Sequence, residues 1–310
     1  MQVSRGVPAL ASHPAVLTIG NFDGLHLGHQ RLLGLLRQKA HALGLPATVM
    51  TFEPHPREFF SPESAPARLA SLREKLIGLA EAGIDHAVVV RFDAHFAALS
   101  ASDFVEQVLV RGLATRHLFI GDDFRFGARR QGDFSMLCEA GDRHRFQVEA
   151  MPTVAVADER VSSSAVRSAL AAGDLAHAGR LLGRPYSIAG RVVRGDRIGR
   201  TLGFPTANVQ LRHRRVALTG IFTVSVEGLA ARALPGVASI GLRPTVSDAG
   251  RTTLEVHVFD YDADCYGAHL RVNFLDKQRD EEKYPNLDLL KAQIARDAAR
   301  ARAWFASKPL

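Results

Sequence analysis

GNFDGLHLGH occupies residues 20–29 and directly follows a short apolar run, residues 15–19. A buried strand, a glycine-containing loop and a helix in that order are typical of a phosphate site in a parallel α/β sheet. Gly20 and Gly24 let the loop backbone approach a phosphate closely. The free N–H groups at the start of the following helix favour negative charge. This stretch therefore predicts a nucleotide-phosphate site.

The two histidines of this stretch, His26 and His29, are three residues apart at the predicted start of the helix. That spacing places both imidazoles on one side, where they can donate hydrogen bonds to a charged, five-coordinate phosphorus. A metal pair or two surface histidines are the alternatives, and no third metal ligand is obvious nearby. The position after the first strand favours nucleotidyl transfer.

The rest of the first half alternates short apolar runs with helical patterns, which predicts a doubly wound, Rossmann-like α/β domain. The predicted strands are residues 15–19, 47–52, 86–92, 116–120 and 145–151. The predicted helices are residues 28–43, 68–82, 102–111 and 133–140, followed by a pair at 162–172 and 174–182 with Ser164 and Asp174 as N-caps.

Three further segments of this half carry polar residues where ligands are expected. GDDFRFG, residues 121–127, and TFEPHP, residues 51–56, lie at the carboxyl ends of predicted strands. His55 is flanked by prolines and is equally compatible with ligand contact and with a structural role. VSSSAVR, residues 161–167, offers hydroxyl groups at a helix start, with Arg167 three residues after Ser164.

The pattern changes after Gly183-Arg184-Pro185, which we interpret as a domain boundary. Five strands separated by Gly, Pro and Asp turns predict an antiparallel sheet or small barrel, and a final helical segment covers residues 287–305. The predicted strands are residues 186–193, 220–226, 236–240, 252–259 and 269–274.

A second glycine-rich loop precedes Pro205-Thr206-Ala207-Asn208, with glycines at 195, 199 and 203. It lacks the GxxxxGK[ST] pattern, so it is not a Walker A loop. The Thr206 hydroxyl and the Asn208 amide are hard oxygen ligands suited to Mg²⁺, although a simple turn before a strand explains their spacing better. Glu255 alternates with apolar neighbours in a strand, where a carboxylate could accept a proton from a substrate hydroxyl.

Composition sets broad limits. The chain has 310 residues, 46% hydrophobic and 23% charged, as in globular proteins with two ordinary domains. The net charge of +7 suits anionic small molecules, but no Lys/Arg stripe with interleaved aromatic residues predicts nucleic-acid binding. Two distant cysteines and the absence of a secretory or membrane-spanning pattern lead us to expect a cytoplasmic protein with no membrane partner.

Taken together, the ordered motifs resemble the bacterial bifunctional riboflavin kinase/FAD synthetases over nearly the whole chain. The motifs are GNFDGLHLGH, TFEPHP, GDDFRFG, VSSSAVR, GRTLGFPTAN, SIGLRPT, LEVHVFD and RDEEKY. The family often has Thr at Ser164, and usually Asn at Ser239 and Phe at Tyr284. The resemblance implies an FMN adenylyltransferase domain at residues 1–184 and a riboflavin kinase domain, a six-stranded antiparallel barrel with a C-terminal helix, at residues 185–310.

The resemblance also implies roles for individual residues. His26 and His29 would stabilise the transition state of adenylyl transfer, and Glu255 would be the kinase base. Expected adenylyltransferase contacts to ATP are Gly20, Asn21, Phe22, Asp23, Gly24, Asp123, Ser162, Ser163, Ser164 and Arg167. Expected FMN contacts are Pro54, His55 and Phe124. Expected kinase contacts are Gly195, Gly199, Arg200, Gly203 and Pro205 for ATP, Arg279 and Glu281 for the flavin, and Thr206 and Asn208 for Mg²⁺.

The implied activity is a two-step synthesis of FAD from riboflavin and ATP, through FMN, with Mg²⁺ as cofactor. A cytidylyl- or adenylyltransferase for another phosphorylated substrate, with a regulatory barrel, is the alternative enzyme. A nucleic-acid-binding protein is the alternative from another class, because related histidine motifs occur in tRNA-charging enzymes.

Overall fold

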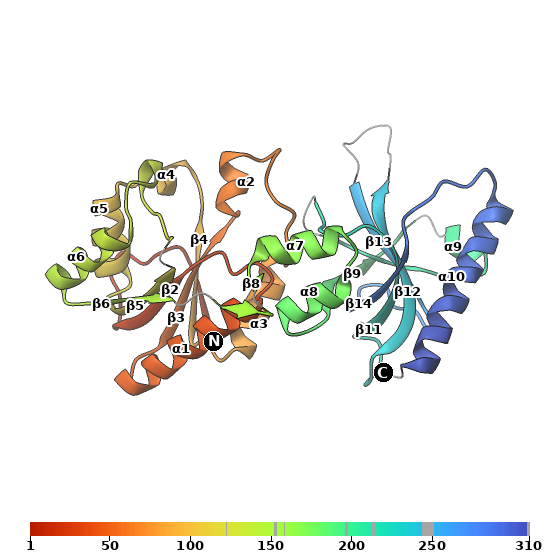
Figure 1. Ribbon diagram of the computed structural model, residues 1–310, viewed down its shortest axis with the longest axis horizontal. Helices are drawn as coiled ribbons and strands as arrows, with labels where there is room; N and C mark the ends of the chain where they lie inside the picture. Colours follow the sequence, from red (N-terminus) through yellow and green to blue (C-terminus); the bar gives the residue numbers. More distant parts are fainter. Residues whose placement is uncertain are drawn as a thin grey trace. The chain divides into compact units, whose positions relative to one another are not determined.

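A computed structural model describes residues 1–121, 123–151, 154–157, 159–195, 198–211, 215–243 and 251–308 (Figure 1). The chain divides into two compact units. The first contains Met1–Pro66 and Leu72–Val161, and the second contains Ala67–Ser71 and Ser162–Leu310. The short segment 67–71 thus belongs with the C-terminal half. The boundary between the two catalytic domains, which the sequence places after residue 184, stays a prediction.

The first unit is built on a six-stranded parallel sheet with the order β1-β4-β3-β2-β5-β6 (Figure 1). All five predicted strands are present, which confirms the α/β fold class, and an edge strand at the N-terminus was not predicted. Its strands are β1 (Gln2–Arg5), β2 (Ala15–Ile19), β3 (Ala47–Glu53), β4 (His86–Arg91), β5 (Thr115–Gly121) and β6 (Gln147–Met151).

Both faces of this sheet are buried, because successive side chains of each strand point to opposite faces. Leu17 and Ile19 of β2 belong to the apolar core on one face, and Val16 belongs to the core on the other. The helices α1 (Leu27–Leu43) and α3 (Leu72–Glu81) cover the Val16 face. The π-helix η1 (Phe104–Gly112) and α6 (Phe134–His144) cover the opposite face.

Several helix boundaries differ from the prediction. Helix α3 begins at Leu72 rather than at residue 68, and the segment predicted as a helix over 102–111 is α5 (Ala101–Asp103) continued by η1. Helix α6 extends to His144 and ends where Arg145 adopts a left-handed conformation, so β6 starts at 147 and not at 145. Three short helices were not predicted: α2 (Pro56–Phe60), α4 (Ala94–Ala97) and η2 (Ala128–Arg130).

The antiparallel pair β7 (Ala155–Val156) and β8 (Glu159–Arg160), which was not predicted, precedes α7 (Ser163–Ala171) and α8 (Leu175–Leu182). The predicted N-cap Asp174 is confirmed, since its side chain accepts from the backbone N of His177. The predicted N-cap Ser164 is wrong. Ser162 is the cap instead: its backbone is extended and its side chain accepts from the N of Ala165, so Ser164 already lies inside the helix, which begins at Ser163.

The second unit contains a closed barrel with the order β10-β13-β12-β11-β14-β9, with antiparallel pairing at every strand-to-strand register observed (Figure 1). This confirms the six-stranded barrel. The sequence pattern missed its sixth strand, which is only three residues long, and the one-turn helix α9 (Ile198–Thr201). Its strands are β9 (Tyr186–Val193), β10 (Ala207–Val209), β11 (Gly220–Glu227), β12 (Leu234–Arg243), β13 (Arg251–Val258) and β14 (His269–Arg279).

Alternation along β13 separates the barrel interior from its outer face, as predicted. Leu254, Val256 and Val258 are buried, whereas Glu255 and His257 are only half-buried. The interior is filled by apolar side chains such as Phe222 and Phe274, whose rings meet edge to face. The chemistry of this unit must therefore lie on the outside of the barrel.

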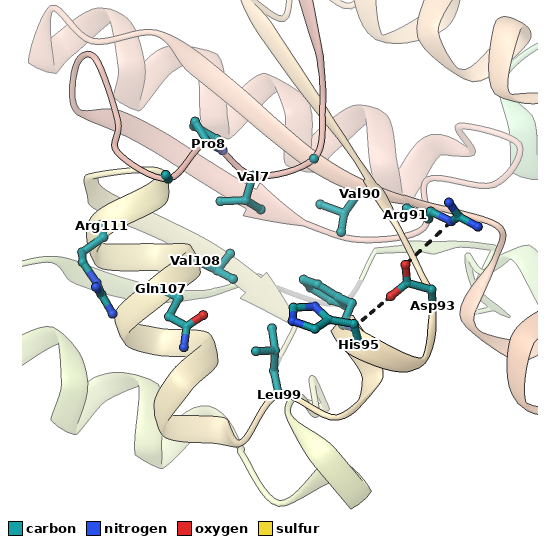
Figure 2. A pocket seen from close by; sticks show the side chains of 13 residues that line it. Val7, Pro8, Val90, Arg91, Asp93, His95, Leu99, Gln107, Val108 and Arg111 are labelled. Carbon is teal, nitrogen blue, oxygen red and sulfur yellow. Dashed lines mark hydrogen bonds and ion pairs between the residues drawn. The ribbon is translucent and has the colours of Figure 1, made fainter.

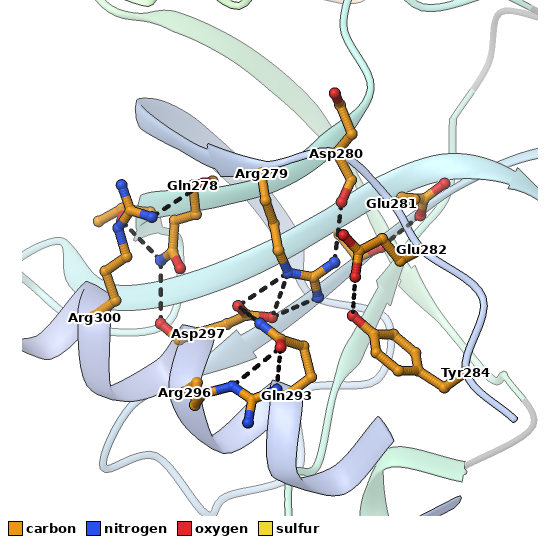
Figure 3. Close-up of polar contacts among 12 residues, drawn as sticks. Gln278, Arg279, Asp280, Glu281, Glu282, Tyr284, Gln293, Arg296, Asp297 and Arg300 are labelled. Carbon is orange, nitrogen blue, oxygen red and sulfur yellow. Dashed lines mark hydrogen bonds and ion pairs between the residues drawn. The ribbon is translucent and has the colours of Figure 1, made fainter. Parts of the chain in front are cut away.

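The C-terminal helix α10 (Leu287–Ser307) packs on β11 and β12 through Ala298, Ala301 and Phe305. Hydrogen bonds and an ion pair also connect α10 to β14 (Figure 3). Arg279 Nη2 donates to Asp297 Oδ2 at 2.6 Å, and Arg279 Nε lies 3.1 Å from Asp297 Oδ1. Gln278 Nε2 donates to the Asp297 carbonyl at 3.1 Å. Asp297 is 6% exposed, so this ion pair is almost dry.

Asp297→Ala should lower the free energy of unfolding of the barrel by about 3 kcal/mol, because it leaves the Arg279 charge in a mostly buried position without its partner. Trp304, the single tryptophan, lies on α10 and reports the transition by fluorescence in urea. Lys291→Ala, an exposed change on the same helix, should shift stability by less than about 0.5 kcal/mol. Equal urea midpoints for Asp297→Ala and the parent protein would contradict the prediction.

Candidate functional site

The loop between β2 and α1 holds both predicted catalytic histidines. His26 is the N-cap of α1, and its Nδ1 accepts from the backbone N of His29 at 3.3 Å. The two imidazole rings stack with centroids 3.7 Å apart and an interplanar angle of 17°. A Cβ on Gly28 would lie 3.1 Å from the His26 ring, so glycine leaves the room that the ring needs. The sequence spacing thus correctly predicted that the two imidazoles lie side by side.

The backbone of this loop is tightly wound. Phe22, Gly24 and Leu25 all have positive φ, with Gly24 at 84°. Phe22 is buried, and its ring centroid lies 5.0 Å from that of His29. The Phe22 ring therefore packs against one side of the His29 imidazole. Asp23 is 4% exposed. The loop is therefore a rigid part of the core and not a solvated turn.

Burial lowers the pKa of His29 well below its ordinary value, and the neighbouring His26 and Lys75 lower it further. His29 is therefore neutral at pH 7. A neutral imidazole can donate one hydrogen bond without carrying charge. Among the described residues, Nδ1 of His29 and Oδ1 of Asn21 are shielded from solvent and have no hydrogen-bond partner.

Sequence reasoning missed Lys75, which lies on α3 and is 4% exposed. Its Nζ donates to Thr51 Oγ1 at 3.2 Å, and Thr51 Oγ1 donates to the carbonyl of Asn21 at 3.3 Å. A lysine in an amphipathic helix is normally solvated, so no signal in the sequence marked this one.

Three further predicted residues of the first site, Asp123, Phe124 and Pro54, lie on loops of the same unit. Asp123 is exposed, and its Oδ2 lies 3.4 Å from Arg160 Nη2. Phe124 stacks on Phe126 with centroids 5.8 Å apart. Pro54 lies between β3 and α2, in the same loop as His55.

His55 has a local structural role, whatever else it contacts. It is the N-cap of α2, and its Nδ1 accepts from the backbone N of Arg57 at 3.1 Å. Its own backbone N donates to Glu58 Oε2 at 3.1 Å, which completes a capping box. Contact between His55 and FMN stays a prediction.

Ser162, Ser163, Ser164 and Arg167 open α7 and belong to the second compact unit. The Ser162 hydroxyl serves as the helix cap. Arg167 Nε donates to the carbonyl of Ala67 at 2.6 Å, which ties α7 to the segment 67–71 of the same unit. The contribution of these four residues to ATP binding stays a prediction.

The second candidate site is a row of polar side chains across three strands of the barrel. Glu255 of β13 is paired in register with Asn208 of β10 on one side and with Ser239 of β12 on the other. Thr206 Oγ1 lies 3.5 Å from Glu255 Oε2. A Cβ on Gly195 would clash with the Asn208 amide, so the glycine backbone lies directly against that side chain. The structure thus brings Gly195, Thr206, Asn208 and Glu255 together.

The loop before β10 is closed by its own backbone. The N of Phe204 donates to the Gly199 carbonyl at 2.8 Å, and the Pro205 carbonyl lies 2.8 Å from His257 Nδ1. Gly203 has a φ of 88°, which favours glycine. The predicted Arg200 has a side chain that lies outside the described residues, as does Asp122 of the first half.

The two predicted flavin-binding residues have different surroundings. Glu281 Oε1 accepts from the Ser239 hydroxyl at 2.8 Å, and a Cβ on Gly241 would clash with its carboxylate. Glu281 therefore lies over β12, linked through Ser239 to the row that contains Glu255. Arg279 is instead engaged by Asp297 of α10 (Figure 3). Sequence reasoning did not identify Ser239 and Gly241 as site residues.

A pocket of about 560 Å³ in the first unit is lined by none of the predicted site residues (Figure 2). It lies between Gly6–Ala9, the end of β4 and η1. Apolar side chains such as Val7 and Val108 line it, and the Arg91–Asp93 ion pair, 3.7 Å between Nε and Oδ2, lies at its edge.

Within the described ranges, no group of three or more His, Cys, Asp or Glu residues is placed to hold a metal ion. The hard oxygen donors Thr206, Asn208 and Glu255 nonetheless fit Mg²⁺, which accepts few protein ligands and completes its shell with phosphate and water. Every helix that the structure describes is too short or too polar to cross a bilayer.

Comparison with known proteins yields a match for each half of the chain. The FAD synthetase family model matches residues 9–165, and the riboflavin kinase family model matches residues 182–305. This chain belongs to the bifunctional riboflavin kinase/FMN adenylyltransferase family. Family members from Escherichia coli (strain K12) and Pseudomonas fluorescens are each 50% identical to it, over 98% of this chain and 98% and 97% of their own lengths.

One solved structure is similar in fold to nearly the whole of this chain. A crystal structure described as a macrolide-efflux protein from Streptococcus pneumoniae has a TM-score of 0.82 and 28% identity, covering 98% of this chain and 100% of that chain.

The depressed pKa of His29 predicts how stability depends on pH. The pKa of an unfolded histidine is about 6.5 and the pKa of folded His29 is lower. As the pH falls, the unfolded chain therefore takes up the proton before the folded chain does. The free energy of unfolding should therefore fall as the pH drops from about 6.5 toward the lower folded value. His29→Gln should lose less stability than the parent over the same pH interval, as measured by urea unfolding. A His29 imidazole that titrates at or above about 6.5 by NMR would contradict this.

Proposed function

We propose that this chain makes FAD from riboflavin in two consecutive reactions, one in each half. The C-terminal half phosphorylates riboflavin with ATP to give FMN, and the N-terminal half adenylylates FMN to give FAD and pyrophosphate. The tandem family matches support an adenylyltransferase module within residues 1–184 and a kinase module within residues 185–310. A purely regulatory barrel does not account for the riboflavin kinase match.

The observation that carries the kinase assignment is the position of Glu255 between Asn208 and Ser239 on the outside of the barrel. A half-buried carboxylate beside neutral amide and hydroxyl groups is suited to accept the proton of the ribityl 5′-hydroxyl. As that proton leaves, the hydroxyl oxygen forms a bond to the γ-phosphorus of ATP. The bond from this phosphorus to the bridging oxygen breaks, and ADP leaves.

Thr206 and Asn208 would hold Mg²⁺ in this site. The metal would neutralise part of the charge on the phosphates when bound. Gly195, Gly199 and Gly203 keep the loop backbone close enough to cover the phosphates. Glu281, held by the Ser239 hydroxyl at 2.8 Å, would bind the flavin, and Arg279 would support it.

In the first half, a phosphate oxygen of FMN attacks the α-phosphorus of ATP, and the bond to the pyrophosphate oxygen breaks. His26 and His29 face this phosphorus and donate hydrogen bonds to its oxygens, whose negative charge increases in the transition state. The GNFDG loop and Asp123 would hold ATP. Pro54, His55 and Phe124 would contact FMN.

We also place this enzyme in the cytoplasm. Cys138 and Cys265 are free thiols, which fits a reducing compartment.

The test is to incubate the purified protein with riboflavin, ATP and Mg²⁺ and to follow flavins by chromatography. FMN should appear first and FAD afterwards, with FAD formed directly when FMN is supplied. Failure to phosphorylate riboflavin, while another phosphorylated substrate accepts a nucleotidyl group, would favour a different nucleotidyltransferase.

Glu255→Gln should stop FMN formation while FAD is still made from added FMN. Glutamine keeps the side-chain volume but cannot accept the hydroxyl proton, and loss of a general base costs about 10²–10⁴ in rate. His26→Ala is the matched control, because it should abolish FAD formation and spare FMN formation. Near-normal kinase turnover in Glu255→Gln, with unchanged thermal stability, would exclude Glu255 as the base.

A further inference from the structure

Lys75 is a lysine in the interior of the first unit, at 4% exposure. An ammonium group is strongly hydrated, and a lysine is almost never fully buried without a compensating contact. The apolar side of α3 is provided by residues such as Leu79, which is fully buried. Packing alone is therefore not the reason for a lysine at position 75.

The ammonium is connected to the GNFDG loop by one intervening residue. Lys75 Nζ donates to Thr51 Oγ1 at 3.2 Å, and the same oxygen donates to the Asn21 carbonyl at 3.3 Å. Thr51 lies in β3 and is fully buried, and Asn21 lies just after the end of the neighbouring strand β2. The positive charge is thus fixed beneath the loop, at the carboxyl edge of the sheet where ligands bind.

The charge of Lys75 also acts on the His29 imidazole. It is one of the two neighbouring groups that lower the pKa of His29, the other being His26. The ionisable side chains of the loop and of the start of α1 are Asp23, His26 and His29, and the end of β3 carries Glu53. The shielded atoms Asn21 Oδ1 and His29 Nδ1, without partners among the described residues, lie on this same loop and helix.

We propose that Lys75 is a positioning residue for adenylyl transfer, which fixes the GNFDG loop through Thr51 and supplies a positive charge beneath the phosphate chain of ATP. This inference rests on the proposed function. A fixed charge in a water-poor site stabilises the negative charge that develops at the α-phosphorus, and it requires no reorganisation during the reaction. The His29 imidazole, whose pKa is lowered by burial, then acts as a donor in its field.

The experiment uses the full chain, with FAD formation from added FMN measured over a range of ATP concentrations and of pH. Lys75→Gln keeps an N–H donor for Thr51 and removes the charge, whereas Lys75→Arg keeps the charge. Lys39→Gln is the matched control, because it removes a positive charge from a partly exposed position of α1, 4.0 Å from Glu149. Riboflavin kinase activity of the same molecules serves as the internal control for enzyme concentration.

Lys75→Gln should lower kcat for FAD formation by about 10²-fold, with a smaller change in KM for ATP. The acid limb of its pH profile should move to higher pH, since His29 loses a neighbouring cation. Lys75→Arg should recover most of the lost rate, and Lys39→Gln should behave as the parent protein. A lysine with only a structural role would not show the recovery by arginine, because Lys75→Arg restores the charge and not the original packing.

Parent-like kcat and an unmoved acid limb in Lys75→Gln would overturn the inference, as would equal losses in Lys75→Arg and Lys75→Gln. If Lys75→Gln does not fold, Thr51→Val tests the same link, and a parent-like rate of FAD formation in that variant would also overturn it. The proposed function fails separately, if the parent protein itself forms no FAD from FMN and ATP.

Discussion

Burial of both faces of the parallel sheet is the constraint on which the rest of the first unit depends. Leu17 and Val16, adjacent in β2, pack into separate cores on opposite faces. No face of the sheet is left for polar chemistry, so functional side chains gather where the strands end. The barrel meets the same constraint differently. Its interior is filled by residues such as Phe222, and its polar row lies on the outer face around Glu255.

The two sites differ in the sign of their central charge. In the first, burial keeps the His29 imidazole neutral, and the positive charge comes from Lys75, which is held away from water by Thr51. This arrangement suits a reaction whose reactants are both anionic. In the second, the central group is the carboxylate of Glu255, which is paired in register with Asn208 and Ser239, and it suits removal of a proton from an alcohol.

Space, as well as charge, is controlled at both sites. Gly28 leaves room for the His26 ring, and Gly195 lets the loop backbone lie against the Asn208 amide. Gly241 leaves room for the carboxylate of Glu281 over β12. A methyl group at any of these positions would displace a side chain that the proposed chemistry uses. The sequence did not show the role of Gly241, because Glu281 belongs to a distant segment of the chain.

The sequence by itself determined the fold class, the pairing of His26 with His29 and the outward position of Glu255. Each depends on local periodicity: the helix repeat for the histidines and strand alternation for the glutamate. Only the tertiary structure decided that Lys75 lies beneath the GNFDG loop and that Asp297 engages Arg279. Such contacts join residues from separate elements, and their partners depend on how helices pack on a sheet or barrel. No pattern within one segment contains that information.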